Sequence, residues 1–142
     1  MIFAVAEMCF KIGTRGVGSS EADMVIVGEM ETLSIAVDNG IEEWTPLNAQ
    51  GWKNRIITSK GLTLTLSGKR CFGDKGNDYV AGLAFAKGDA ARSKIRVEFP
   101  NGDRVDMDCI VSVTTPGGGE STDVNALEFE CLSVGIPTYT EV

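Results

Sequence analysis

Four acidic residues at alternate positions are the side chains of this sequence whose spacing could support catalysis. Asp106 and Asp108 lie in one stretch, and Glu128 and Glu130 lie in another. Residues two apart on a β-strand point to the same face, so each pair presents two carboxylates together. If the two strands are neighbours, all four carboxylates cluster on one sheet face. Glycosidases use two carboxyl groups across a cleft, one of them with its pKa raised by burial.

The surroundings of these residues do not favour catalysis. The four residues lie on exposed positions of regular strands, and no loop pattern builds a pocket around them. The chain has no histidine, which excludes His-based dyads and the usual zinc sites. Its four cysteines form no C-x-x-C pair and are predicted to be free thiols, with Cys109 and Cys131 facing the core. We therefore predict no enzymatic activity, no metal ion and no cofactor.

Two loop sequences share features with ligand-binding motifs but lack essential parts. Asp74 and Asp78 lie in GDKGND, without the further ligands and the terminal glutamate of a calcium loop. Three glycines at 117–119 are not followed by the lysine of a phosphate-binding loop. Neither loop predicts a bound ion or nucleotide.

The charge of the chain suggests another use for the acidic residues. The formal net charge is -7, which argues against a general nucleic-acid binder. Like charges on one sheet face cost stability, so their presence calls for a functional reason. An acidic wall repels a DNA duplex over a screening distance of about 8 Å at physiological salt. Such a face suits a surface that DNA passes without binding.

The acidic pairs are carried by strands that the sequence predicts clearly. Lys94 to Val113 alternates in two arms around Pro100-Asn101-Gly102-Asp103, a pattern typical of a β-hairpin. A last strand from about Asn125 to Val134 carries the second pair. Other predicted strands cover residues 4–12, 24–27, 31–38, 55–59 and 62–67. A turn is predicted at Asn39-Gly40.

The remaining elements are one helix and several connections. A helix is predicted from about Tyr79 to Lys87, capped by Asn77 or Asp78 and closed by Gly88. Residues 44–52 are predicted as a connection whose flanking Trp44 and Trp52 act as packing anchors. At 142 residues the chain fits one domain, residues 1–142. The fold class is mainly β: an antiparallel β-sandwich or partial barrel with one short flanking α-helix.

The segment from Gly13 to Asp23 has no periodicity and is predicted as a flexible loop. Its length leaves open a second interpretation, in which it orders on a partner. The apolar N-terminal stretch is interrupted by Glu7 and Lys11 and has no basic leader, so we expect neither a signal peptide nor a membrane span. Synthesis in a reducing cytoplasm follows from this expectation.

Several motifs along the chain resemble those of the major tail tube proteins of tailed bacteriophages. They are Trp-x-Pro and Gly-Trp in WTPLNAQGW (44–52), GDKGND (73–78) and FPNG (99–102), and they occur in the expected order. The resemblance covers roughly residues 30 to 138. It implies hexameric rings that stack into a tube, which conducts the DNA genome into the host without specific binding. It also implies a virion tail location and other tail proteins as partners: the tape measure, tail terminator and baseplate proteins.

The resemblance assigns roles to the two unusual features of the sequence. Asp106, Asp108, Glu128 and Glu130 would face the lumen of the tube. The loop would contact the neighbouring ring through these residues: Arg15, Gly16, Val17, Ser19, Ser20 and Glu21. A tail terminator or tail-completion ring protein is an alternative, as is a carbohydrate-binding β-sandwich, which would need exposed aromatic side chains on one sheet face.

Overall fold

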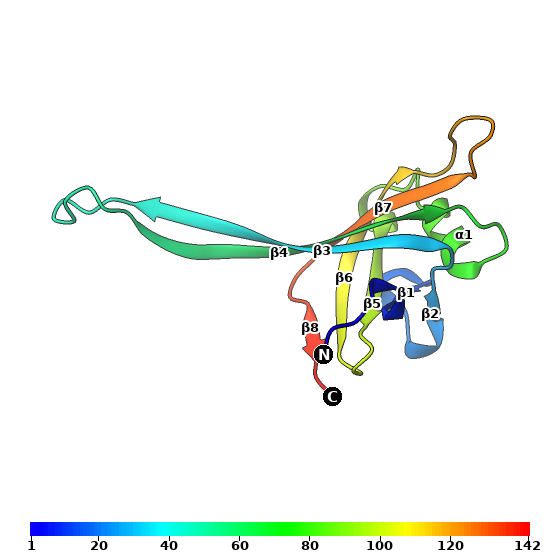
Figure 1. The fold of residues 1–142 in the computed structure, drawn as a ribbon, viewed down its shortest axis with the longest axis horizontal. Coiled ribbons are helices and arrows are strands. Elements are labelled where there is room, and N and C mark those ends of the chain that lie inside the picture. Colours follow the sequence, from blue (N-terminus) through cyan, green and yellow to red (C-terminus); the bar gives the residue numbers. More distant parts are fainter.

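The computed structural model describes residues 1–142 as one open antiparallel sheet with a short helix beside it (Figure 1). The strand order is β2-β1-β5-β6-β7-β4-β3, and β8 pairs with β6. The strands are β1 (Cys9–Gly13), β2 (Met24–Ile26), β3 (Met30–Trp44), β4 (Asn54–Lys69), β5 (Arg92–Glu98), β6 (Arg104–Thr115), β7 (Ala126–Ser133) and β8 (Thr138–Thr140). The helices are α1 (Lys75–Gly82) and the short 3-10 helices η1 (Val5–Glu7), η2 (Gly16–Gly18), η3 (Glu21–Asp23) and η4 (Gly88–Ala91). The mainly β fold with one short α-helix is confirmed.

The sheet curls so that strands far apart in its order share one core. Phe10 of β1 and Phe129 of β7 have ring centroids 5.9 Å apart, although β5 and β6 lie between these strands. The core consists of the alternate inward residues of the strands and Val80 of α1, as the period-two pattern requires. Cys109 and Cys131 are buried free thiols in this core, as predicted. A hydrogen bond with Cys109, together with burial, raises the pKa of Cys131.

The central hairpin forms as the sequence predicts. β5 pairs with β6 in the register that joins Val97 to Val105. Its turn closes through hydrogen bonds from the Gly102 amide to the Phe99 carbonyl (2.9 Å) and from the Phe99 amide to the Asp103 carbonyl (2.8 Å). Gly102 has a φ of 97°, which a residue with a Cβ would adopt only with strain.

The predicted turn at Asn39-Gly40 is wrong. β3 runs straight through these residues to Trp44 and pairs with β4 along its whole length, with a register shift opposite Gly40 and Ile41 where Thr58 of β4 is the extra residue. A Cβ on Gly40 would lie 1.9 Å from the Ser59 hydroxyl oxygen, so a larger residue here would have to displace the Ser59 hydroxyl group. The separate strands predicted at 55–59 and 62–67 are therefore parts of one strand, β4.

The predicted helix is displaced by about one turn along the chain. α1 begins at Lys75, and its N-cap is Asp74, whose carboxylate accepts a hydrogen bond from the Asn77 amide (3.0 Å). The helix ends at Gly82 rather than at Gly88. The same carboxylate also accepts a hydrogen bond from the Gly28 amide (2.9 Å), which fixes Asp74 at the cap position. This contact joins residues far apart in the sequence, so the local pattern does not reveal it.

The N-terminal part of the chain also differs from the prediction. The strand expected at residues 4–12 begins only at Cys9, after the 3-10 turn η1. β8 was not predicted, and it pairs with the start of β6, between Arg104 and Asp106. No helix of the chain is both long and apolar enough to cross a membrane.

Candidate functional site

The β3–β4 hairpin projects far beyond the body of the molecule (Figure 1). β3 has 15 residues and β4 has 16, but β7 pairs with β4 only from Thr63 to Lys69. The part of β4 from Asn54 to Leu62 therefore has only β3 beside it. At about 3.4 Å per residue, this free part is roughly 30 Å long. An isolated two-stranded ribbon is marginally stable in water, so a projection of this kind is expected to find a partner.

On one face of the hairpin, the alternate apolar residues that face the core at the base continue into the part that is exposed to solvent. Ile35 lies opposite Leu64, Val37 opposite Leu62, and Ile41 opposite Ile57. Leu64 is buried in the body, whereas Ile41 and Ile57 are 53% and 49% exposed. We call Ile35, Val37, Ile41, Ile57 and Leu62 the apolar hairpin face. The hydrogen-bonded pair Asn39 and Lys60 (3.2 Å) lies on the same face between Val37 and Ile41. Groups of exposed apolar residues of this kind mark interaction sites.

The opposite face at the base of the hairpin is rich in hydroxyl groups. The cross-strand pairs there are Thr32 with Ser67, Ser34 with Thr65, and Ala36 with Thr63. β7 continues this face with Glu128 and Glu130, which lie beside Ser67 and Thr65. We call these eight residues the acid-hydroxyl face. Its two carboxylates have no basic side chain opposite them on β4.

The four predicted acidic residues do not form one cluster. They share a sheet face, but β7 pairs with the far end of β6, so that Glu130 lies opposite Ser112 and Glu128 opposite Thr115. Asp108 is four residues from Ser112 along β6, which is roughly 14 Å. The idea of a single acidic cluster is therefore wrong, because the register of β6 and β7 places the two pairs at opposite ends.

The first acidic pair is also not free of positive charge. β5 places Arg96 opposite Asp106 and Lys94 opposite Asp108. The Asp106 carboxylate lies 2.6 Å from Nε of Arg96 and 3.3 Å from Nε of Arg104. Single-sign charge therefore remains only on the acid-hydroxyl face, at Glu128 and Glu130.

The Gly13–Asp23 segment is folded onto the sheet. It contains η2 and η3, and its residue Ser19 is buried. Glu21 binds the nearly buried Arg96 guanidinium with both carboxylate oxygens, and this hydrogen bonding lowers the pKa of Glu21. The Ser93 hydroxyl donates a hydrogen bond to the Gly13 carbonyl (2.9 Å). Of the residues predicted to contact a neighbouring ring, Ser19 is buried and Gly16 is half-buried, and the others are exposed: Arg15, Val17, Ser20 and Glu21.

Trp44 and Trp52 lie at the tip of the hairpin and are 48% and 77% exposed. Neither side chain packs into the core of this chain. Leu47, between them, is fully exposed. These residues do not line one broad sheet face, which is the arrangement that a carbohydrate-binding sandwich would need.

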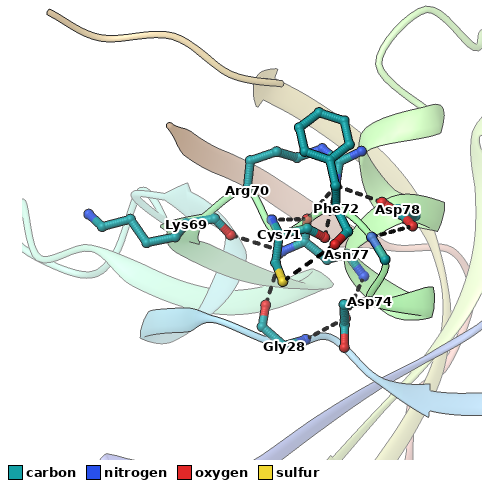
Figure 2. Close-up of polar contacts among 9 residues, drawn as sticks. Gly28, Lys69, Arg70, Cys71, Phe72, Asp74, Asn77 and Asp78 are labelled. Atoms are coloured by element: carbon teal, nitrogen blue, oxygen red, sulfur yellow. Dashed lines mark hydrogen bonds and ion pairs between the residues drawn. The ribbon is translucent and has the colours of Figure 1, made fainter. Parts of the chain in front are cut away.

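A polar network fastens the base of the hairpin to helix α1 (Figure 2). The buried Asn77 amide group donates hydrogen bonds to the Gly28 carbonyl (3.0 Å), just before β3, and to the Lys69 carbonyl (2.9 Å), at the end of β4. Its oxygen accepts hydrogen bonds from Arg70 (2.9 Å) and from the Cys71 amide (3.0 Å). One side chain therefore contacts both the start and the end of the hairpin.

The acidic residues of this network already have partners. The Asp74 carboxylate accepts hydrogen bonds from the Gly28 and Asn77 amides. The Asp78 carboxylate accepts a hydrogen bond from the Arg70 guanidinium (2.8 Å). The hydrogen bond from Arg70 lowers the pKa of Asp78. No group of three or more cysteine, aspartate and glutamate residues could hold a metal ion.

The two edges of the sheet differ greatly in length. β2, at one edge, has three residues, whereas β3, at the other, has 15 residues and leaves the backbone groups of alternate residues unpaired along its outer side. A long exposed edge is a template for pairing with another chain. The hairpin thus combines an open edge, an apolar face and an aromatic tip.

This fold is found in the tails of gene transfer agent (GTA) particles. A chain of the structure described as the tail of an empty GTA particle, with C6 symmetry, matches with a TM-score of 0.79 and 14% sequence identity, over 99% of this chain and 100% of that chain. A chain of the virion of a native gene transfer agent matches with a TM-score of 0.74 and 14% identity, also over 99% of this chain and 100% of that chain. Comparison with protein-family models and with curated protein sequences finds no match. The tail-like fold implied by the sequence motifs is therefore confirmed.

Proposed function

We propose that this chain is a structural tail protein that forms hexameric rings, which stack into a tube conducting DNA. The observation that carries the proposal is the projecting hairpin with its exposed apolar face, in a chain that has the fold of GTA tail chains. The C6 symmetry of the similar tail supports six copies per ring. The role is structural rather than enzymatic, and its location is the tail of a virion or a virion-like particle.

Assembly gives a physical reason for the exposed hairpin. Another copy that covers the apolar hairpin face removes half-exposed isoleucines from water, at about 25 cal/mol per Å² of apolar surface. Pairing along the free edge of β3 satisfies its backbone groups and closes the open sheet around the ring. Trp44, Leu47 and Trp52 at the tip then pack against a neighbouring copy, since aromatic side chains contribute strongly at interfaces.

The contact between rings is assigned to the hairpin, which reaches farthest from the body. The Gly13–Asp23 segment, for which the sequence suggested this role, is a second candidate through its exposed residues Arg15, Val17 and Ser20. Its hydrogen bonds to Ser93 and Arg96 leave less of it available than the hairpin offers. Both segments are proposed to contact only further copies of the chain.

The acid-hydroxyl face is proposed to line the lumen. Glu128 and Glu130 supply negative charge, and the flanking threonine and serine side chains offer no cation to a DNA phosphate. A DNA duplex carries one charge per ~1.7 Å, and a basic wall would bind it at each step. Asp106 and Asp108 contribute less to the repulsion because Arg96 and Lys94 lie opposite them.

Electron microscopy of the concentrated, purified chain tests this function. We expect rings with sixfold symmetry and, at higher concentration, long tubes. A tail terminator or tail-completion protein would form rings that do not stack into long tubes. A chain that stays monomeric at every concentration, with the hairpin in solvent, would refute the proposal. A glycan-binding signal that is lost on Trp44→Ala would favour the carbohydrate-binding alternative instead.

A further inference from the structure

The GDKGND segment takes no part in the contacts proposed above, yet it contains a side chain whose hydrogen-bonding capacity is fully used. A side-chain amide has two N–H donors and one oxygen with two lone pairs. All four are occupied at Asn77, which is completely buried. Two of the four partners, the Gly28 and Lys69 carbonyls, flank the β3–β4 hairpin on its two sides (Figure 2).

The hairpin needs such a device because its tip does not define its register. A two-residue turn fixes which residues of two strands lie opposite each other. Trp44 and Asn54 form the last pair of the ladder, and residues 45–53 between them form a longer connection without strand pairing. β3 has no neighbour other than β4, so no second strand holds it in place. The register therefore depends on the apolar pattern of the two strands and on the contacts at the base of the hairpin.

The base is closely packed around Asn77. The Lys69 amide donates a hydrogen bond to the Glu29 carbonyl (2.8 Å). A Cβ on Gly68 would lie 2.2 Å from that carbonyl oxygen, so the chain before β3 crosses directly over the end of β4. Asp74 holds the Gly28 amide while Asn77 holds the Gly28 carbonyl. Gly28 is thus fixed on both of its backbone groups relative to Lys69.

We propose that Asn77 is a positioning residue for assembly: its side-chain amide sets the register of the β3–β4 hairpin from the base. The assembly part of this statement rests on the proposed function, whereas the register part concerns the single chain. A slip of one residue would turn β3 over, because side chains alternate between the faces. Ala36, Asp38 and Glu42 would then take the places of Ile35, Val37 and Ile41 on this face. The apolar hairpin face would be lost, although the body would remain folded.

Hydrogen exchange measured by mass spectrometry on Asn77→Asp tests this inference. Aspartate keeps the shape of the side chain and the oxygens that accept from Arg70 and Cys71, but it lacks the N–H groups that bind Gly28 and Lys69. Each lost bond is worth roughly a factor of ten, so exchange in residues 30–38 should accelerate by about tenfold or more. Exchange in β5 and β6 should stay within about twofold of the wild-type rate. The measurement is made at protein concentrations at which light scattering detects no assembly.

Asp78→Asn is the matched control, because it is the reverse isosteric change on the next residue. It removes the ion pair with Arg70 but touches neither Gly28 nor Lys69. Faster exchange confined to the Arg70–Gly82 region is expected. Equal acceleration of β3 in both variants, or acceleration spread evenly over all strands in Asn77→Asp, would overturn the inference, since either result describes a general loss of stability.

The wild-type chain provides a second test if Asn77→Asp does not fold. A register set at the base requires protection of β3 amides to be greatest near Thr32 and to decrease towards Trp44. The opposite gradient, with the slowest exchange near Trp44, would show that the tip sets the register and would overturn the inference.

Assembly of the variants separates this inference from the proposed function. Folded Asn77→Asp with the expected exchange pattern should form few or no tubes, while Asp78→Asn and the wild-type chain form them normally. Normal tube formation by Asn77→Asp would refute the positioning role and leave the proposed function intact. Absence of tubes from all three proteins would refute the proposed function, and the exchange data would still decide the register.

Discussion

The double substitution Ile41→Thr and Ile57→Thr should prevent tube assembly without unfolding the chain. The two isoleucines lie opposite each other on the apolar hairpin face, and each is about half exposed. Full burial of an isoleucine is worth about 1.5–3 kcal/mol, so covering the remaining half contributes roughly 1 kcal/mol per residue. The pair contributes about 2 kcal/mol to each contact, and its loss should raise the concentration needed for assembly about thirtyfold.

Light scattering against protein concentration measures this effect directly. Threonine is β-branched and favours strands, so the free energy of unfolding of the single chain should change by less than about 1 kcal/mol. Ile136→Thr is the control, because Ile136 is almost fully exposed and lies outside the hairpin. Assembly of the double variant at the wild-type concentration would refute the reasoning that the apolar hairpin face is buried between copies.

Two further predictions concern the lumen and the C-terminal strand. Glu128→Lys with Glu130→Lys should leave tubes assembled, because both side chains lie on the acid-hydroxyl face, but should slow DNA ejection from particles; ejection at the normal rate would contradict the lumen assignment. The Val142 amide and the Tyr139 hydroxyl donate hydrogen bonds to Asp103 and lower the pKa of its carboxyl group. The stability that they provide is present above the ordinary aspartate pKa and is lost as the pH falls through the lowered value, so NMR signals of β8 should show its release only in strong acid. Asp103→Asn should release β8 at neutral pH, and an unchanged β8 in that variant would contradict this account.

Local sequence patterns predicted the parts of the fold that depend on alternation and turn chemistry. The hairpin from Lys94 to Val113 follows from two alternating arms around Asn101-Gly102, and no distant contact competes with it. The burial of Cys109 and Cys131 follows from the same alternation. Each of these features is decided within about twenty residues of sequence.

Features set by distant contacts could not be predicted in this way. Asn39-Gly40 is typical of a tight turn, but pairing with Lys60 and Ser59 of β4 keeps both residues within a continuous strand. The helix begins at Lys75 because Asp74 also binds Gly28, 46 residues away along the chain. The alternation correctly predicted that the four acidic residues share one sheet face. Their distance along that face depends on the pairing register of β6 and β7, which the connection between these strands sets and the alternation of either strand does not.

The most useful missed signal was the continuity of alternation in the hairpin. Leu33, Ile35 and Val37 alternate up to Asn39, and Ile41 resumes the same face beyond Gly40. Treating the glycine as an ordinary position of a continuous strand would have predicted a strand too long for the body of a domain of this size. The exposure of Trp44 and Trp52 follows from that length, because they lie at its far end.

A high-resolution electron microscopy reconstruction of the assembled chain tests the central claim most directly. We predict rings of six copies in which Ile41 and Ile57 are buried against another copy, the β3 edge is paired, and Glu128 and Glu130 face the bore. A reconstruction in which the apolar hairpin face stays open to solvent, or in which lysine and arginine side chains line the bore, would contradict the account.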